Sequence, residues 1–249
     1  MGTRGDKLVA RWRSERLERD VTLVRWGTIG QPILLFPTAG GDAEEIERFQ
    51  MIDALAPLLD AGKIKIYSCD SVAGKALVTR EGSARHQMWV QNQFHHYVRH
   101  EVVPAIRMDC KSDLEIWAAG SSIGAFHAAA VVCRFPDVFS RALAMSGTYD
   151  LRRFYDAQPH DFSDDFWVSS PVHFVPGLAG RHLDVLRTRF VYITSGEGKA
   201  EDIGESWNLA NVLGRKGIPN RVDSWGPDWP HDWVTWRRML PQILGEWTK

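Results

Sequence analysis

The stretch WAAGSSIGAFHAAAVVCRFPDVF (residues 117–139) joins an apolar run to a helical pattern through a turn of two glycines and two serines. Gly120, Ser122 and Gly124 fit the pattern G-x-S-x-G, which follows the apolar run LEIWAA and precedes the periodic segment AFHAAAVVCRF. In that context the central serine occupies a strained strand-to-helix turn that exposes its hydroxyl as a nucleophile. An ordinary turn with a helix cap is the alternative interpretation of Ser122.

Short apolar runs and longer amphipathic segments alternate along the rest of the chain. Apolar runs bounded mostly by Gly, Pro or Asp predict strands at residues 20–27, 31–37, 63–70, 114–120, 141–147, 189–196 and 220–226. Helical periodicity lies between them, at residues 43–61, 86–107, 123–135, 201–217 and 232–247. This alternation predicts an α/β fold with a mostly parallel sheet covered by helices on both faces.

One segment departs from this alternation. Residues 149–181 are aromatic, acidic and proline-rich, without clear periodicity. We expect them to form an irregular, cap-like excursion over the strand ends, where open α/β sheets bind their ligands. The chain length and the lack of low-complexity tracts favour a single domain over residues 1–249 with this excursion inside it.

The composition argues against several classes of partner. The formal net charge is −1, from 30 basic and 31 acidic residues, and no long run of like charge predicts a surface for nucleic acid or anionic membrane. The N-terminus lacks the apolar core of a secretory signal, and no apolar stretch approaches the length of a membrane span. Cys69, Cys110 and Cys133 have no metal-ligand spacing and suit a reducing compartment. We therefore expect a soluble cytoplasmic protein with a small-molecule partner, and a homo-oligomer is left open.

A nucleophilic serine needs a base and an orienting acid, which follow a G-x-S-x-G elbow in the order serine, acid, histidine. His231 lies in the loop GPDWPHDWVTW, after the last predicted strand and at the start of the last predicted helix. We predict that His231 is the base, and a solvated helix-capping histidine is the alternative. Glu197, Glu201 and Asp202 compete for the acid in the loop SGEGKAED, and their spacing leaves all three open.

Four motifs in this order resemble one branch of the α/β hydrolases. They are FPTAGGDAEE (36–45), GSSIGAFHAA (120–129), SGEGKAED (195–202) and HDWVTW (231–236). The chain is similar, over about residues 20–247, to the putative-esterase branch, which includes S-formylglutathione hydrolases of the esterase D type, feruloyl esterases and bacterial mycolyltransferases. The resemblance implies an α/β-hydrolase fold and a serine esterase. No cofactor or metal is expected.

The resemblance also selects one of the three acids. In the mycolyltransferase pattern the acid stands two residues before a glycine, and on this sequence that position is Asp202, before Gly204. Glu201 ranks next and Glu197 third.

The oxyanion hole requires two backbone N–H donors. One is expected from Ile123, the residue after the nucleophile. Comparison with the family assigns the second donor to Ala39, with Gly40 as the alternative. The loop at residues 38–41 lacks the HGGG sequence of many lipases, and Ala125 stands where many relatives have a second glycine. Neither departure removes a catalytic group, so they concern the subfamily that the chain resembles more than the chemistry.

Other features are assigned mostly to ordinary structure. His96 and His100 have a spacing that can bind zinc, but no cysteine or acidic ligand set accompanies them, so a solvated helix face is favoured. The sequence GEGK (196–199) lacks the frame of a phosphate-binding loop. Among the 11 tryptophans, Trp229 and Trp167, the latter with its neighbour Phe166, are predicted substrate walls.

The sequence thus predicts a carboxylic-ester hydrolase that forms an acyl-enzyme on Ser122, with His231 as base and Asp202 as orienting acid. Transfer of the acyl group to a sugar or another alcohol, on the same triad, is the alternative enzyme function. A non-catalytic binding protein with a hydrolase fold is the alternative of another class, and the intact order of serine, acid and histidine argues against it.

Overall fold

The computed structural model describes residues 7–249, so the first six residues of the predicted 1–249 domain lie outside the described residues. Its centre is an eight-stranded sheet with the order β1-β2-β4-β3-β5-β6-β7-β8. The β1–β2 and β2–β4 pairs are antiparallel, and the other five pairs are parallel. The strands are β1 (Leu8–Ser14), β2 (Arg19–Trp26), β3 (Gln31–Phe36), β4 (Ile64–Cys69), β5 (Ile116–Ser121), β6 (Phe139–Met145), β7 (Phe190–Ser195) and β8 (Asn220–Ser224).

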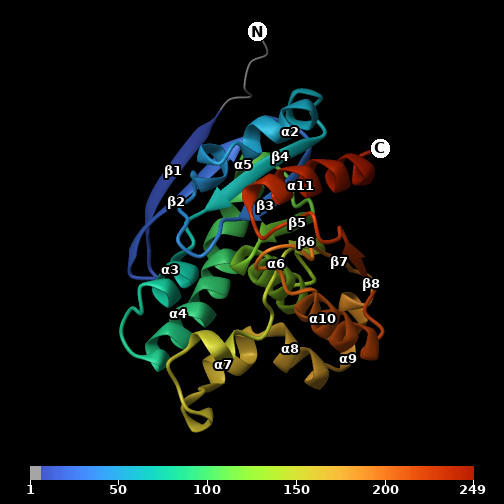
Figure 1. The fold of residues 1–249 in the computed structure, drawn as a ribbon. Coiled ribbons are helices and arrows are strands. Elements are labelled where there is room, and N and C mark those ends of the chain that lie inside the picture. Colours follow the sequence, from blue (N-terminus) through green and yellow to red (C-terminus); the bar gives the residue numbers. More distant parts are fainter. Residues whose placement is uncertain (1–6) are drawn as a thin grey trace.

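Helices cover both faces of this sheet (Figure 1). The α-helices are α1 (Glu45–Arg48), α2 (Met51–Asp60), α3 (Val72–Val78), α4 (Ala84–Tyr97), α5 (Val103–Cys110), α6 (Ile123–Arg134), α7 (Asp164–Ser169), α8 (Pro171–Phe174), α9 (Gly180–Leu186), α10 (Ile203–Arg215) and α11 (Trp233–Trp247). Helices α1, α2 and α11 pack on one face, and α4, α5, α6, α9 and α10 pack on the other. The predicted α/β fold with a mostly parallel sheet is therefore confirmed. None of the helices within residues 7–249 is long and apolar enough to cross a membrane.

Strand β1 is missing from the predicted strands. Its sequence LVARWRS mixes apolar side chains with arginines, and it pairs only with β2 at the edge of the sheet. The Glu101 carboxylate accepts hydrogen bonds from the Trp12 indole and the Ser14 hydroxyl, at 2.8 Å each. Because these contacts join residues far apart in the sequence, periodicity along the chain does not reveal this strand.

Several predicted helical segments are divided differently in the structure. The segment 43–61 is broken between α1 and α2 at Gln50, whose φ is +62°. The segment 86–107 runs from α4 into α5 through a π-helical turn, η1 (Val98–Val102). Helix α3 was not predicted.

The segment 149–181, expected to be irregular, contains short helices. They are α7, α8, the first residues of α9, and the 3-10 turns η2 (Leu151–Phe154), η3 (Pro159–Asp161) and η4 (Val175–Gly177). Figure 1 shows α7 and α8 on the side of α6 that faces away from α2 and α11.

A buried polar network ties helix α6 to helix α4. Arg134 Nη1 lies 3.0 Å from His95 Nδ1, and a guanidinium can only donate, so the proton of neutral His95 is on Nε2. Nε2 lies 3.1 Å from Nδ1 of His127, which accepts the hydrogen bond in this tautomer, and 3.2 Å from the side-chain amide of Gln91. His127 therefore carries its own proton on Nε2, which has no hydrogen-bond partner among residues 7–249. Both histidines are fully buried and neutral in the folded state.

This network predicts a loss of stability in acid. Burial lowers the pKa of His127 to about 3, whereas a histidine of the unfolded chain has a pKa of about 6.5. The unfolded state therefore binds the proton first as the pH falls below 6.5, and the stability present above that pH is progressively lost toward pH 3. For His127 alone we expect the free energy of unfolding to fall by about 2 kcal/mol between pH 7 and pH 5.

Urea unfolding of His127→Gln at these two pH values checks this expectation. Its loss of stability between pH 7 and pH 5 should be smaller than that of the unmodified protein by about 2 kcal/mol. His160→Gln is the matched control, because the His160 side chain is 81% exposed and its removal should leave the pH dependence unchanged. Equal pH dependence in His127→Gln and the unmodified protein would contradict the buried neutral state.

Candidate active site

Ser122 occupies a sharp turn between β5 and α6. Its φ is +57° and its ψ is −122°, a strained conformation for a residue with a side chain. A Cβ atom on Gly120 would lie 2.4 Å from the Gly124 backbone, and one on Gly124 would lie 2.6 Å from the Phe36 carbonyl oxygen. The two glycines therefore let β5, α6 and β3 approach one another closely. The strand, turn and helix around Ser122 are arranged as the motif predicts.

His231 lies in the loop between β8 and α11. Its backbone N–H donates to the Lys199 carbonyl at 3.0 Å, and its ring meets the Trp236 ring edge-on with centroids 5.1 Å apart. His231 and Ser122 line the same pocket, of about 350 Å³. The chain thus brings together the two residues that the sequence predicts as base and nucleophile.

The carboxylate beside His231 belongs to Glu201. Its Oε2 lies 3.4 Å from His231 Nδ1, and the side chain is only 1% exposed. The Ser195 hydroxyl donates to Oε2 at 3.1 Å, and the Ser146 hydroxyl donates to Oε1 at 2.5 Å. The Trp236 indole N–H in turn donates to the Ser146 oxygen at 2.9 Å. Both oxygens of the buried Glu201 side chain therefore have hydrogen-bond partners, as buried polar groups require.

The prediction that the Asp202 carboxylate contacts His231 is wrong. Asp202 is the N-cap of α10, and its Oδ1 accepts the Gly204 N–H at 3.0 Å on the surface. The cause is a tight turn in which the Glu201 N–H donates to the Gly198 carbonyl at 3.1 Å, with Ala200 at φ +64°. This turn brings the inward-facing carboxylate one residue earlier than the family pattern implies. Glu197, the third candidate, accepts a hydrogen bond from the Ser224 hydroxyl instead.

The loop after β3 faces Ser122 across the pocket. Thr38, Ala39 and Gly40 all line this pocket. The buried Glu45 carboxylate fixes the loop, because it accepts the Thr38 N–H and the Thr38 hydroxyl, both at 2.7 Å. The Gly41 N–H donates to the Thr38 carbonyl at 3.0 Å. Among residues 38–41, this leaves the N–H groups of Ala39 and Gly40 as the donors not already bonded within the described chain.

A second pocket, of about 280 Å³, is also lined by Ser122. Ala39 and Ser122 line both pockets, whereas His231 lines only the first. The second pocket has mainly apolar walls, and its apolar side chains beyond Ala39 are Leu77, Val78, Ile123, Leu151 and Phe154.

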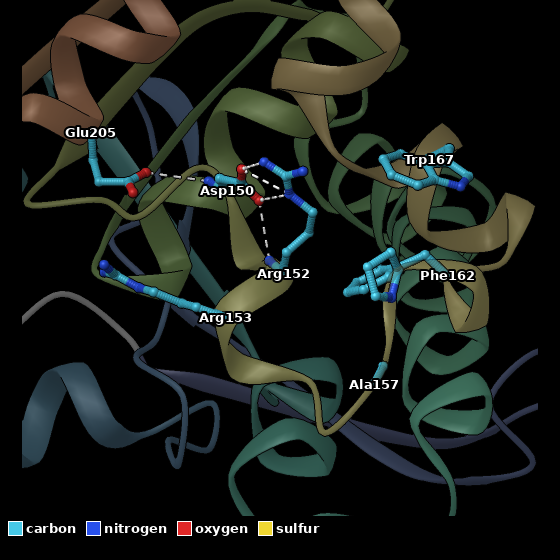
Figure 2. Close-up of a pocket in the computed structure, with 8 residues that line it drawn as sticks. Asp150, Arg152, Arg153, Ala157, Phe162, Trp167 and Glu205 are labelled. Atoms are coloured by element: carbon cyan, nitrogen blue, oxygen red, sulfur yellow. Dashed lines mark hydrogen bonds and ion pairs between the residues drawn. The ribbon is translucent and has the colours of Figure 1, made fainter.

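The three predicted substrate walls lie elsewhere. Phe166 is 1% exposed and packs in a cluster with Ile123 and Leu151, behind the second pocket. The Trp229 ring packs edge-on against the Trp225 ring, with centroids 5.1 Å apart. Trp167 lines a separate outer pocket of about 470 Å³ (Figure 2). None of the three lines either of the pockets that contain Ser122.

Figure 2 shows that the outer pocket also holds an ion pair between Asp150 and Arg152. Glu205 lies on one side of this pair, and the rings of Phe162 and Trp167 lie on the other. The Glu205 carboxylate accepts hydrogen bonds from the backbone N–H groups of Tyr149 and Asp150, at 2.8 and 3.2 Å, so it has a structural role at this pocket. This pocket is formed by the 149–181 segment and α10, away from His231.

Sequence reasoning missed the two serines that hold Glu201. Ser146 and Ser195 each follow an apolar run and precede a glycine, in RALAMSG and RFVYITSG, so the repeated Ser-Gly at two neighbouring strand ends was a usable signal. Ser146 also has a positive φ, of +51°. Residues 7–249 contain no group of three or more His, Cys, Asp or Glu side chains that could hold a metal ion. His96 and His100 are stacked, with ring centroids 6.0 Å apart.

Comparison with known families gives a match over most of the chain. The family model described as "Putative esterase" matches residues 60–247. No match was found among curated protein sequences.

Solved structures with the same fold cover nearly the whole chain. A ferulic acid esterase is 16% identical, with a TM-score of 0.72, and the match covers 98% of this chain and 97% of that one. An S-formylglutathione hydrolase from Agrobacterium tumefaciens is 12% identical, with a TM-score of 0.71 and coverage of 100% and 96%. The fluorophosphonate-binding serine hydrolase FphF from Staphylococcus aureus is 14% identical, with a TM-score of 0.68 and coverage of 98% and 99%. At these identities the three likenesses establish the shared fold.

Proposed function

Because this chain belongs to the "Putative esterase" family and is a carboxylic-ester hydrolase, we propose that it cleaves its ester through an acyl-enzyme on Ser122. In this proposal His231 is the general base and Glu201 is the acid that orients it. The substrate is a small-molecule ester, and the reaction needs no cofactor.

One arrangement carries the proposal. Ser122 and His231 face a common pocket, and the buried Glu201 carboxylate lies against Nδ1 of His231. A carboxylate at Nδ1 keeps the proton there, so Nε2 is free to accept the serine proton. A capping histidine would need neither a buried carboxylate nor a strained serine in its pocket, so this arrangement supports a catalytic role over a structural one.

The reaction proceeds in two halves. The Ser122 hydroxyl gives its proton to Nε2 of His231 as its oxygen bonds to the ester carbonyl carbon. The carbonyl oxygen becomes an anion, and we assign its two donors to the N–H groups of Ile123 and Ala39, with Gly40 as the alternative to Ala39. His231 then returns the proton to the leaving alcohol as the carbon–oxygen bond breaks. Water attacks the acyl-enzyme in the same way and releases the acid.

The Ile123 donor follows from its position at the start of a helix. Ile123 is the first residue of α6, where backbone N–H groups have no partner in the preceding turn. The positive end of the α6 dipole points to the same place and favours a developing negative charge. The loop that carries Ala39 is held by Glu45, so both donors are fixed before the substrate binds.

Labelling with a fluorophosphonate probe tests the proposal. We expect one probe molecule per chain, attached to Ser122, and a burst of p-nitrophenol from p-nitrophenyl acetate before steady turnover. Both signals should disappear in Ser122→Ala. A folded chain that neither reacts with the probe nor hydrolyses esters would instead support the non-catalytic binding protein.

A further inference from the structure

The two pockets that meet at Ser122 differ in one respect that bears on the substrate. His231 lines the first pocket and is absent from the lining of the second. Ser122 and Ala39 belong to both, so the reacting carbon has to lie where the two pockets join. Each pocket can therefore be assigned to one side of the ester bond.

The assignment follows from the four groups around the reacting carbon. In the tetrahedral intermediate that carbon carries the Ser122 oxygen, the oxyanion, the leaving oxygen and the acyl chain. The oxyanion faces the N–H groups of Ile123 and Ala39, and the leaving oxygen has to face His231, which protonates it. The acyl chain takes the remaining direction, away from His231, which leads into the second pocket.

We propose that the second pocket binds the acyl group, that the first pocket binds the alcohol, and that the substrate is an ester of a short or medium-length apolar acid. This inference rests on the function proposed above. Leu77 and Val78 from α3, together with Leu151 and Phe154 from η2, then determine acyl specificity.

The chemistry of the second pocket supports an apolar acyl group. Its one charged lining residue is Arg80, whose side chain is 76% exposed and lies 3.6 Å from the Asp156 carboxylate. Leu151 is fully buried, whereas Val78 and Phe154 are 61% and 48% exposed. An apolar acyl chain bound here would remove the exposed apolar surface of these side chains from water, which favours its binding.

The size of the second pocket limits the length of the acyl chain. Its volume of about 280 Å³ lies just below the range of about 300–1,000 Å³ that is usual for drug-sized ligands. We expect little room for the pocket to deepen, because Ile123 and Leu151 belong to a buried hydrophobic cluster that also contains Phe166. A long lipid chain would therefore extend into solvent at the mouth between Val78 and Phe154.

Turn η2 is the wall between the second pocket and the outer pocket. Leu151 and Phe154 line the second pocket, and Arg152 and Arg153 line the outer one, as Figure 2 shows for the two arginines. The Arg153 guanidinium lies 5.0 Å from the Phe154 ring centroid. Asp150, the N-cap of η2, forms an ion pair with Arg152 within the turn. The acyl wall is therefore held from its outer side by charged groups that do not enter the second pocket.

Two series of esters test the assignment. In the first the alcohol is always p-nitrophenol, and the acid is acetic, butyric, hexanoic, octanoic or palmitic. In the second the acid is always butyric and the alcohol is methanol, ethanol, butanol or glycerol. For the unmodified enzyme we expect kcat/KM to rise by about fourfold per methylene along the first series until the pocket is full, and to be lower for palmitate.

Two variants alter the acyl side. Val78→Trp narrows the mouth of the second pocket and should lower the ratio of octanoate to acetate kcat/KM by at least about tenfold. Phe154→Ala widens it and should move the optimum to a longer acid. Neither variant should change the ratios within the alcohol series by more than about twofold, because that series probes the other pocket. Val168→Trp is the matched control, since Val168 is exposed on α7 and lines neither pocket.

The outcomes separate this inference from the function on which it rests. A change in the acyl series alone supports the assignment. A change in the alcohol series with an unchanged acyl profile, or no change in either series, overturns it while esterase activity itself stands. If the unmodified protein hydrolyses no ester of either series and does not react with the fluorophosphonate probe, both the proposed function and the assignment are overturned.

Discussion

Ser122→Ala should lower kcat for ester hydrolysis by at least about 10⁴-fold and leave the protein folded. In the proposed mechanism the Ser122 oxygen forms the bond to the substrate carbonyl carbon, and the substitution removes that oxygen. Alanine has the same Cβ as serine, so the strained backbone at φ +57° is no worse in the variant. Initial rates with p-nitrophenyl butyrate and thermal unfolding measure the two effects.

Ser121→Ala is the matched control for this variant. Ser121 is the last residue of β5 and is 4% exposed, and it lines neither of the pockets that contain Ser122. The same one-oxygen change beside the elbow should therefore keep kcat within about threefold, as expected for a group outside the proton transfer. Full turnover in Ser122→Ala, or an equal loss in Ser121→Ala, would remove Ser122 from the proposed mechanism.

The sequence predicted seven of the eight strands found within residues 7–249, because their signal is local. Apolar runs such as QPILLF and the run before Ser121 are buried on both faces, and their neighbours in the chain mark the ends. The eighth strand, β1, lies at the sheet edge, and contacts with Glu101 hold it in place. Such contacts depend on the folded structure and leave little trace in the local pattern.

The candidate site also has a part that the sequence predicts and a part that it does not. Ser122 and His231 lie in loops whose position in the order of strands and helices was enough to select them. Whether Glu201 or Asp202 faces His231 depends on a single turn, which the hydrogen bond from the Glu201 N–H to the Gly198 carbonyl closes. In this turn Glu201 points inward, and Asp202, the next residue, caps α10 instead. The family pattern selected Asp202, one residue after the carboxylate that lies against His231 in the structure.

Beyond the residues selected for catalysis, the walls of the second pocket could not be predicted from the sequence. Val78, Ile123 and Phe154 come from three separate elements that meet only after α3, α6 and η2 have packed together. Aromatic residues in the 149–181 segment were reasonable candidates for substrate contact, but Phe166 is buried behind the pocket and Trp167 lies in the outer one. Side-chain type indicates what a residue can contact, and only the packing decides whether it does so.

Glu201→Gln should lower kcat by at least about a hundredfold, and Asp202→Asn by no more than about threefold. The proposed role of Glu201 is to hold the proton on Nδ1 of His231 and to stabilise the imidazolium that forms as Ser122 attacks. A neutral amide of the same shape supplies no charge for the imidazolium and can present an N–H group to Nδ1, which favours the wrong tautomer. The loss should therefore appear in kcat far more than in KM.

Asp202→Asn is a matched control for that charge change. It neutralises the next residue in the chain, and asparagine can still accept the Gly204 N–H as the N-cap of α10. Its free energy of unfolding should stay within about 1 kcal/mol of the unmodified value. Steady-state kinetics of both variants with p-nitrophenyl butyrate, together with urea unfolding, give the comparison. A hundredfold loss in Asp202→Asn with normal turnover in Glu201→Gln would restore Asp202 as the acid, and would mean that the loop rearranges during catalysis.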